Sequence, residues 1–330
     1  MPENSQALLD PEETSVSDPT PTVYQTYLTR KNPQEWSATY NLYSDLKFQG
    51  ESDHVQRFLN CRTTSFFVRH NQTGRVHVHT NACRLRWCPL CANAKAKYQK
   101  MAVLDWCNTR RNLKLLTLTL KHSPAPLEHQ LTHLYRCFTA FRKDRIIRNT
   151  IRGAIWFTQI KLAKSDSLWH PHVHLIIDSD FIPQATLVAI WNRITKTSKI
   201  VDIRAIKTPR IAVAYVGRYA ARPAQLAVLT PGKRAELALA LRSKRLAGTW
   251  GTAREIKLTA PPITDKHHWQ PLGTWETIIN TKATNDESRR IFEAWQTGNI
   301  YTGLPVEPEL QRIWTRAHIL DEPEPLATYP

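Results

Sequence analysis

The sequence predicts a fold that combines β-strands with α-helices. Between residues 113 and 221, short apolar runs rich in strand formers alternate with longer segments whose apolar residues recur at the helical period. Ahead of this region, residues 63–70 and 75–80 flank Asn71-Gln72-Thr73-Gly74, a pattern typical of a β-hairpin. The chain has 330 residues, which is enough for one sizeable core with an appendage or for two modest domains.

The first part of the chain is predicted to be a tail followed by a small module. Residues 1–35 are rich in Pro, Ser, Thr and Glu and have little to bury, so we expect a disordered N-terminal tail. Residues 36–110 form the expected module. Its elements are a helix near 36–48, the hairpin, and a helix from about 92 to 108.

The central region, residues 111–225, carries the alternation of strands and helices. The apolar positions of residues 127–148 follow a helical period, and Pro183 stands where proline commonly opens a helix. In order, the expected elements are strand 113–120, helix 127–148, strands 154–162 and 171–178, helix 183–194, strand 201–206 and helix 209–221.

The C-terminal region, residues 226–330, has a weaker pattern and is predicted to be mainly helical. Five tryptophans lie in it, and we expect them to pack in a core rather than to stack on bases, because tryptophan more often fills cores. They are Trp250, Trp269, Trp275, Trp295 and Trp314. The expected elements are helices 233–246, 286–297 and 307–318 and a strand over 250–259.

The charge balance indicates a polyanionic partner. Lys and Arg number 45 against 28 Asp and Glu, which gives a formal net charge of +17. The first 21 residues contain no base, so the excess lies in the middle of the chain. Contacts with phosphates supply most non-specific affinity for nucleic acid, which is therefore the expected partner. No apolar run is long enough to cross a membrane and the N-terminus is no signal peptide, so we expect a cytoplasmic protein.

A cysteine cluster predicts a structural zinc site. Cys83, Cys88 and Cys91 have the close spacing with which thiolates of a tight turn bind one ion. A closed tetrahedral site needs a fourth ligand, for which Cys61 is preferred and His79 is the substitute. Cys107 and Cys137 are expected to be ordinary buried thiols. A redox pair formed by Cys88 and Cys91 is the disfavoured alternative.

The segment Trp169-His-Pro-His-Val-His-Leu-Ile-Ile-Asp178 predicts a half-site for a divalent ion. Residues i and i+2 of a strand point to the same face, so His172 and His174 project side by side while Val173 faces a core. His170 has the same parity. For the similar pair His77 and His79 we expect no ligand.

Two tyrosines lie four residues apart in the helix expected over 209–221. Tyr215 and Tyr219 would share one helical face, and Arg218 and Arg222 an adjacent one. Tyrosine, arginine and a metal ion together suit phosphoryl transfer through a covalent intermediate. By itself such a pair more often covers a core, so its weight comes from its co-occurrence with the histidine strand.

Together these segments resemble the rolling-circle replication initiators, the Rep proteins of the HUH endonuclease superfamily. Leu116-Thr-Leu-Thr119 resembles the first motif of the family, His170-Pro-His-Val-His174 the metal-binding motif, and Tyr215-Val-Gly-Arg-Tyr219 the nucleophile motif in its two-tyrosine form. The cysteine cluster resembles that of plasmid-type members. The resemblance covers residues 61–223. It implies an α+β fold, with an RRM-like antiparallel sheet, flanking helices and the histidines on a central strand, preceded by the zinc-binding module.

The sequence departs from the family pattern at two positions. Relatives often carry a glutamate as third metal ligand on the strand before the histidine strand, and Gln159 stands there; the alternative third ligand is His170. Some plasmid initiators have a glutamate four residues before the nucleophile, and Tyr215 stands there. That alignment makes Tyr219 the first choice of nucleophile and Tyr215 the second.

The resemblance implies a metal-dependent DNA-nicking enzyme. Mg²⁺ or Mn²⁺ would be the catalytic cofactor, with a tyrosine forming a 5′-phosphotyrosine bond at a single-stranded or hairpin origin site. Arg218 and Arg222 would bind DNA, and a host helicase is an expected partner. Two alternatives are a two-tyrosine transposase, which shares the chemistry, and a non-catalytic zinc-dependent DNA-binding protein.

Overall fold

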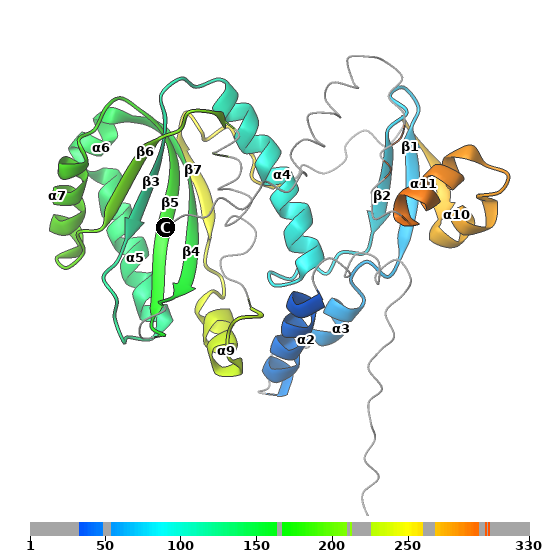
Figure 1. Cartoon of the computed structure of the whole chain (residues 1–330), viewed down its shortest axis with the longest axis horizontal. Helices are drawn as coiled ribbons and strands as arrows, with labels where there is room; N and C mark the ends of the chain where they lie inside the picture. Colours follow the sequence, from blue (N-terminus) through cyan, green and yellow to red (C-terminus); the bar gives the residue numbers. More distant parts are fainter. Residues whose placement is uncertain are drawn as a thin grey trace, which may run out of the picture.

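The structure is a computed structural model that describes residues 33–48, 54–163, 167–209, 212, 226–259, 268–296, 301 and 303. It confirms an α+β fold with antiparallel sheets and flanking helices. Figure 1 shows a five-stranded sheet and a three-stranded sheet with α4 (Pro89–Asn108) between them.

The five-stranded sheet has the order β6-β3-β5-β4-β7, and every neighbouring pair is antiparallel. Its central strand, β5, carries the histidine motif. The strands are β3 (Leu113–Thr119), β4 (Ile151–Leu162), β5 (Trp169–Ser179), β6 (Val201–Ala205) and β7 (Ala247–Gly251).

Helices cover both faces of this sheet (Figure 1). On one face α5 (Leu127–Lys143), α6 (Arg145–Thr150) and α7 (Gln184–Thr195) pack on residues such as Leu118, Trp156 and Val173. On the other face Val103 and Trp106 of α4 pack on alternate residues of the same strands. The central strands are therefore covered on both sides, and many of their apolar residues alternate between two cores.

The helix expected over 127–148 is interrupted, which corrects the prediction. Asp144 has extended backbone angles, φ −56° and ψ 140°, and ends α5. Its carboxylate accepts the N–H groups of Ile146 and Ile147 and so begins α6 as an N-cap. Arg193 of α7 pairs with the same carboxylate at 2.5 Å, which holds the break against the neighbouring helix.

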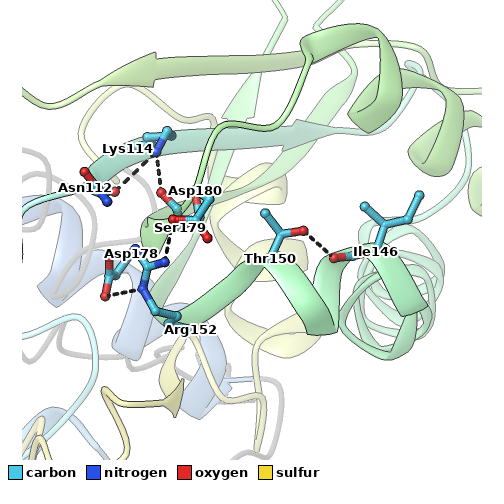
Figure 2. Close-up of polar contacts among 8 residues, drawn as sticks. All are labelled: Asn112, Lys114, Ile146, Thr150, Arg152, Asp178, Ser179 and Asp180. Atoms are coloured by element: carbon cyan, nitrogen blue, oxygen red, sulfur yellow. Dashed lines mark hydrogen bonds and ion pairs between the residues drawn. The ribbon is translucent and has the colours of Figure 1, made fainter.

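The ends of β3, β4 and β5 that lie far from the histidines are joined by polar contacts (Figure 2). Arg152 contacts Asp178 at 2.7 Å and 3.3 Å and Asp180 at 2.7 Å. The Nζ of Lys114 donates to the carbonyl of Ser179 at 2.5 Å. The acidic residues that follow the histidine motif thus serve to join strand ends.

The expected hairpin is confirmed as β1 (Ser65–His70) and β2 (Val76–Thr80), paired antiparallel. A third strand, β8 (Trp269–Thr274), pairs with β1, and α10 (Trp275–Thr281) and α11 (Asp286–Gln296) follow it. The sequence pattern predicts no strand at β8. It predicts a strand over 250–259, whereas β7 spans Ala247–Gly251 and the chain then turns. Residues after 225 thus complete both sheets.

A third packing unit lies beside the cysteines. It combines α2 (Pro33–Phe48), α3 (Val55–Leu59) and α9 (Pro231–Ala240), so α2 begins inside the expected tail and α9 ends before the expected residue 246. The carboxylate of Glu35 accepts the N–H groups of Leu226 and Ala227 at 3.3 and 3.1 Å. The first described helix is therefore held to a segment that lies 191 residues later in the sequence.

The described tryptophans of the C-terminal region pack on the protein's own side chains, as expected. Trp250 contacts Phe138, and Trp275 contacts Phe67 and Phe292. Trp269 lies against His70. The side chains of Trp295 and Trp314, and the helix expected over 307–318, lie outside the described residues.

Candidate functional site

The histidines of β5 alternate with core residues, as the sequence predicts. His172 and His174 are 6% and 8% exposed and lie on the α4 face of the sheet, together with Ile176. Val173 and Leu175 point the other way, into the core beneath α5 and α7. The apolar packing on the far face holds β5 rigidly, so the two imidazoles have a defined orientation.

Neighbouring strands bring two further polar side chains to these histidines. Gln159 of β4 stands opposite His172, and Thr117 of β3 opposite His174. The Oε1 of Gln159 lies 2.6 Å from the Nε2 of His172 and 2.9 Å from the Nε2 of His174. The Oγ1 of Thr117 lies 3.0 Å from the Nδ1 of His174. Two imidazoles and one amide oxygen therefore converge on one point.

The three converging atoms fit a divalent cation. Ligands at about 2.1 Å from an octahedral ion lie about 3.0 Å apart when they are neighbours, close to the two distances from the Gln159 oxygen to the imidazole nitrogens. The Oγ1 of Thr117 can accept a hydrogen bond from the Nδ1–H of His174, which leaves the Nε2 lone pair for the metal. We refer to His172, His174 and Gln159 as the histidine–glutamine centre.

Burial keeps both imidazoles neutral, which is the form that binds metal. Burial, with neighbouring positive charge from His174, His170 and Lys161, lowers the pKa of His172 to about 2. Burial and Lys161 lower the pKa of His174 to about 4. The Nδ1 of His172 is buried and has no hydrogen-bond partner within the described ranges. Burying these two imidazoles costs folding free energy, so their position serves something other than packing.

Two more histidines extend this row toward the surface. The ring of His170 lies 5.3 Å from that of His172, and the ring of His122 lies 4.2 Å from that of His170. His170 is half-buried and His122 is exposed. His122 is not among the site residues expected from the sequence. Because β3 runs antiparallel to β5 and Thr119 pairs with His172, the residues that follow β3 approach His170, and this pairing is the signal that points to His122.

The tyrosine segment is only partly described. Tyr215, Arg218, Tyr219 and Arg222 lie outside the described residues. Ala212, three residues before Tyr215, is fully buried against the α4 face of the sheet, among Val103, Ile155, Phe157 and Ile176. The chain therefore enters the tyrosine motif from the sheet face that carries the histidines.

The four predicted cysteines come together at the start of α4. Their four Sγ atoms all lie within 4.8 Å of one another. The Sγ of Cys61 is 3.6 Å from those of Cys88 and Cys91, and the Sγ of Cys83 is 3.7 Å from that of Cys91. Tetrahedral zinc with bonds of about 2.3 Å would separate its sulfur ligands by about 3.8 Å, so the cluster could hold such a metal.

The remaining cysteines and the alternative ligand lie elsewhere. His79 is not part of the group that could hold a metal; it packs edge-on against His77, at 5.0 Å between ring centroids. Cys107 and Cys137 are buried in α4 and α5, and burial raises the pKa of the Cys107 thiol to about 12. They are therefore unreactive packing residues.

None of the helices that the structure describes is long and apolar enough to span a bilayer.

Comparison with known proteins agrees with the motifs. A family model described as "Replication protein" matches residues 74–300, more than half of the chain. The chain is also similar to "Protein rep" of Staphylococcus aureus, at 21% identity over 164 residues, which cover 45% of this chain and 72% of the relative. No solved structure matches the chain significantly. The matched residues include the three cysteines at 83–91, the whole five-stranded sheet and the tyrosine segment. The chain belongs to the replication protein family.

Proposed function

We propose that this protein initiates rolling-circle replication of a plasmid by nicking one strand of origin DNA with a tyrosine. The convergence of His172, His174 and Gln159 on one point is the observation that carries this proposal. A buried cluster of neutral nitrogen and oxygen ligands at a central strand has no evident packing purpose, but it suits a cation that contacts phosphate. Membership of the replication protein family favours replication over transposition.

His172, His174 and Gln159 would hold Mg²⁺ or Mn²⁺, with His170 as the alternative third ligand. When bound, such an ion supplies a positive charge that polarises the scissile phosphate. Thr117 orients the imidazole of His174 through a hydrogen bond at Nδ1 of that ring. Val173 holds β5 in place by packing into the core on the opposite face of the sheet. The protein's part is thus to hold ligands in place before substrate arrives.

Tyr219 is the proposed nucleophile, with Tyr215 second. The tyrosine oxygen attacks phosphorus, the bond from phosphorus to the 3′-oxygen breaks, the phenolic proton leaves to solvent, and the departing 3′-oxygen takes a proton from solvent. The products are a 5′-phosphotyrosine bond and a free 3′-hydroxyl that can prime synthesis. Arg218 and Arg222 would hold the phosphate oxygens. In a second transfer the other tyrosine would rejoin the displaced strand.

Chain connectivity supports the role of this segment. Ala212 precedes Tyr215 by three residues in the sequence, and its side chain packs on the sheet face of the histidines. It shares a core with Phe157, which stands directly opposite His174. The last described residue before the tyrosine motif therefore lies on the face of the histidine–glutamine centre, which supports the proposed role of the residues that follow it.

The proposed role of the cysteine cluster is structural. With zinc bound, Cys61, Cys83, Cys88 and Cys91 would fix the loop that precedes α4 and so the start of the helix that covers the histidine face. Such a module adds a rigid, basic surface for DNA and takes no part in the chemistry.

The test is a cleavage assay on labelled single strands derived from the protein's own replicon, run with Mn²⁺ and with EDTA on a denaturing gel. We expect metal-dependent cleavage with label trapped on the protein. Tyr219→Phe should abolish the trapped product, Tyr215→Phe should reduce it, and His172→Ala should abolish cleavage. Tyr98→Phe and His79→Ala are matched controls that should retain activity. Tight binding without cleavage on every strand would favour a non-catalytic DNA-binding protein.

A further inference from the structure

A pocket of about 940 Å³ lies between the first half of α4, the cysteine loop and residues 243–259. Eight of its described lining residues are Lys or Arg, and none is Asp or Glu. They include Lys95 on α4, Arg86 in the cysteine loop, and Arg254 and Lys257 after β7. We call it the basic pocket.

The positive charge of the basic pocket is not neutralised within the described part of the chain. None of its eight cations forms an ion pair there, whereas Arg152 at the far end of the sheet is paired with Asp178 and Asp180 (Figure 2). Arg86 is half-buried and donates only to a backbone carbonyl, that of Lys244, at 3.0 Å. Crowded cations of this kind are stabilised when an anion binds among them.

The basic pocket adjoins the histidine–glutamine centre. Ala247, which lines the pocket, is paired with Phe157, and Phe157 is paired with His174. Neighbouring strands are about 4.8 Å apart, so the pocket floor lies about 10 Å from His174 along this row. Ala247 and Phe157 both belong to the core beneath α4, so the pocket and the centre lie on the same sheet face.

The dimensions and lining fit the backbone of a single strand. A volume of 940 Å³ corresponds to a cube with an edge of about 10 Å, smaller than the major groove of B-DNA at about 12 Å, so the pocket cannot enclose a duplex. The described lining residues include no aromatic side chain on which a base could stack. Phosphates are thus the part of the strand that this lining can recognise, without regard to sequence.

We propose that the basic pocket binds the sugar–phosphate backbone of single-stranded DNA next to the scissile phosphate, a few nucleotides from the histidine–glutamine centre. This proposal rests on the proposed function in taking DNA as the polyanion and in placing the scissile phosphate at the histidine–glutamine centre. Binding there would hold the strand after nicking, without any contribution from metal or tyrosine.

The test measures binding without chemistry. A fluorescein-labelled single strand of about 20 nucleotides and mixed sequence is titrated by fluorescence anisotropy in EDTA, at several salt concentrations. The variant combines Lys95→Gln, Arg254→Gln and Lys257→Gln, all of which are exposed residues. The control combines Lys143→Gln, Arg145→Gln and Arg148→Gln, exposed cations beside α6 that change the net charge equally.

We expect the pocket variant to lose at least ten-fold in affinity near physiological salt. Its slope of log affinity against log salt should fall by about 2, since each phosphate contact with a single strand contributes about 0.7. The control should change little. Equal losses in both variants, no loss in either, or a larger loss for duplex than for the single strand would overturn the proposal. Because EDTA prevents cleavage, failure of the nicking assay would leave this result interpretable.

Discussion

Gln159 and His172 stand directly opposite each other on β4 and β5, with the amide oxygen 2.6 Å from the imidazole Nε2. The same oxygen is 2.9 Å from the Nε2 of His174, so the neutral amide of Gln159 contacts both imidazoles. The centre therefore contains no carboxylate among its three converging groups. Its charge and its affinity for hard cations can be changed at a single position.

We expect Gln159→Glu to bind Mn²⁺ and Mg²⁺ at least ten-fold more tightly than the wild type. A carboxylate supplies the negative charge and the hard oxygen that these ions prefer. Isothermal titration calorimetry with each ion measures the change. Gln72→Glu, in the exposed hairpin turn, adds the same charge far from the sheet and should have no effect. Unchanged affinity in Gln159→Glu would mean that residue 159 is not a ligand.

Acid should destabilise the metal-free protein through the buried histidines. The folded-state pKa values of about 2 for His172 and 4 for His174 lie below the unfolded value of 6.5, so the unfolded chain binds more protons. Stability is thus full above pH 6.5 and falls as pH decreases toward 4, by up to about 1.4 kcal/mol per pH unit for each histidine.

Urea unfolding at several pH values between 7.5 and 5, with wild type and His174→Gln, measures this effect. The variant should lose less stability per pH unit, since it lacks one of the two depressed groups. His77, whose pKa is lowered to about 4 mainly by burial, is present in both proteins and cancels in the difference. Parallel pH profiles would contradict the prediction.

Cys88→Ser should remove the metal from the cysteine cluster and lower the thermal unfolding temperature by several degrees. Cys88 is fully buried at the N-cap position of α4, and a hydroxyl is a poor substitute for a zinc-bound thiolate. Zinc content by mass spectrometry and a thermal melt check both effects. Cys137→Ala, a buried thiol outside the cluster, should retain zinc. Normal zinc content in Cys88→Ser would exclude Cys88 as a ligand.

Gly251→Ala should destabilise the protein by about 2 kcal/mol or more. Gly251 ends β7 with φ +60°, and an added Cβ would lie 2.1 Å from the carbonyl oxygen of Arg152. Gly232→Ala is the opposite case: it lies in α9 with no atom within 4 Å of the new Cβ, and should stabilise by up to about 1 kcal/mol. Urea unfolding of both variants tests the pair, and similar effects in both would contradict it.

Several helices and strands differ from those expected because the expectations rest on the local sequence pattern alone. The helical period of residues 127–148 continues through Asp144, but the carboxylate there caps a new helix and pairs with Arg193 of α7. β8 has little alternation of its own and exists because β1 offers it an edge. Likewise β7 is a short segment that becomes a strand through pairing with β4.

By itself, the sequence determined which side chains are brought together within one short segment. The period of two in a strand places His172 and His174 on one face, and the spacing of Cys83, Cys88 and Cys91 brings three thiols to one turn. Only the tertiary structure decided the partners that come from elsewhere: Thr117 for His174, the choice of Cys61 over His79 for the cluster, and the cations of 243–259 for the basic pocket. The reason is that backbone geometry sets spacing within a segment, whereas strand register and the packing of distant segments depend on the whole chain.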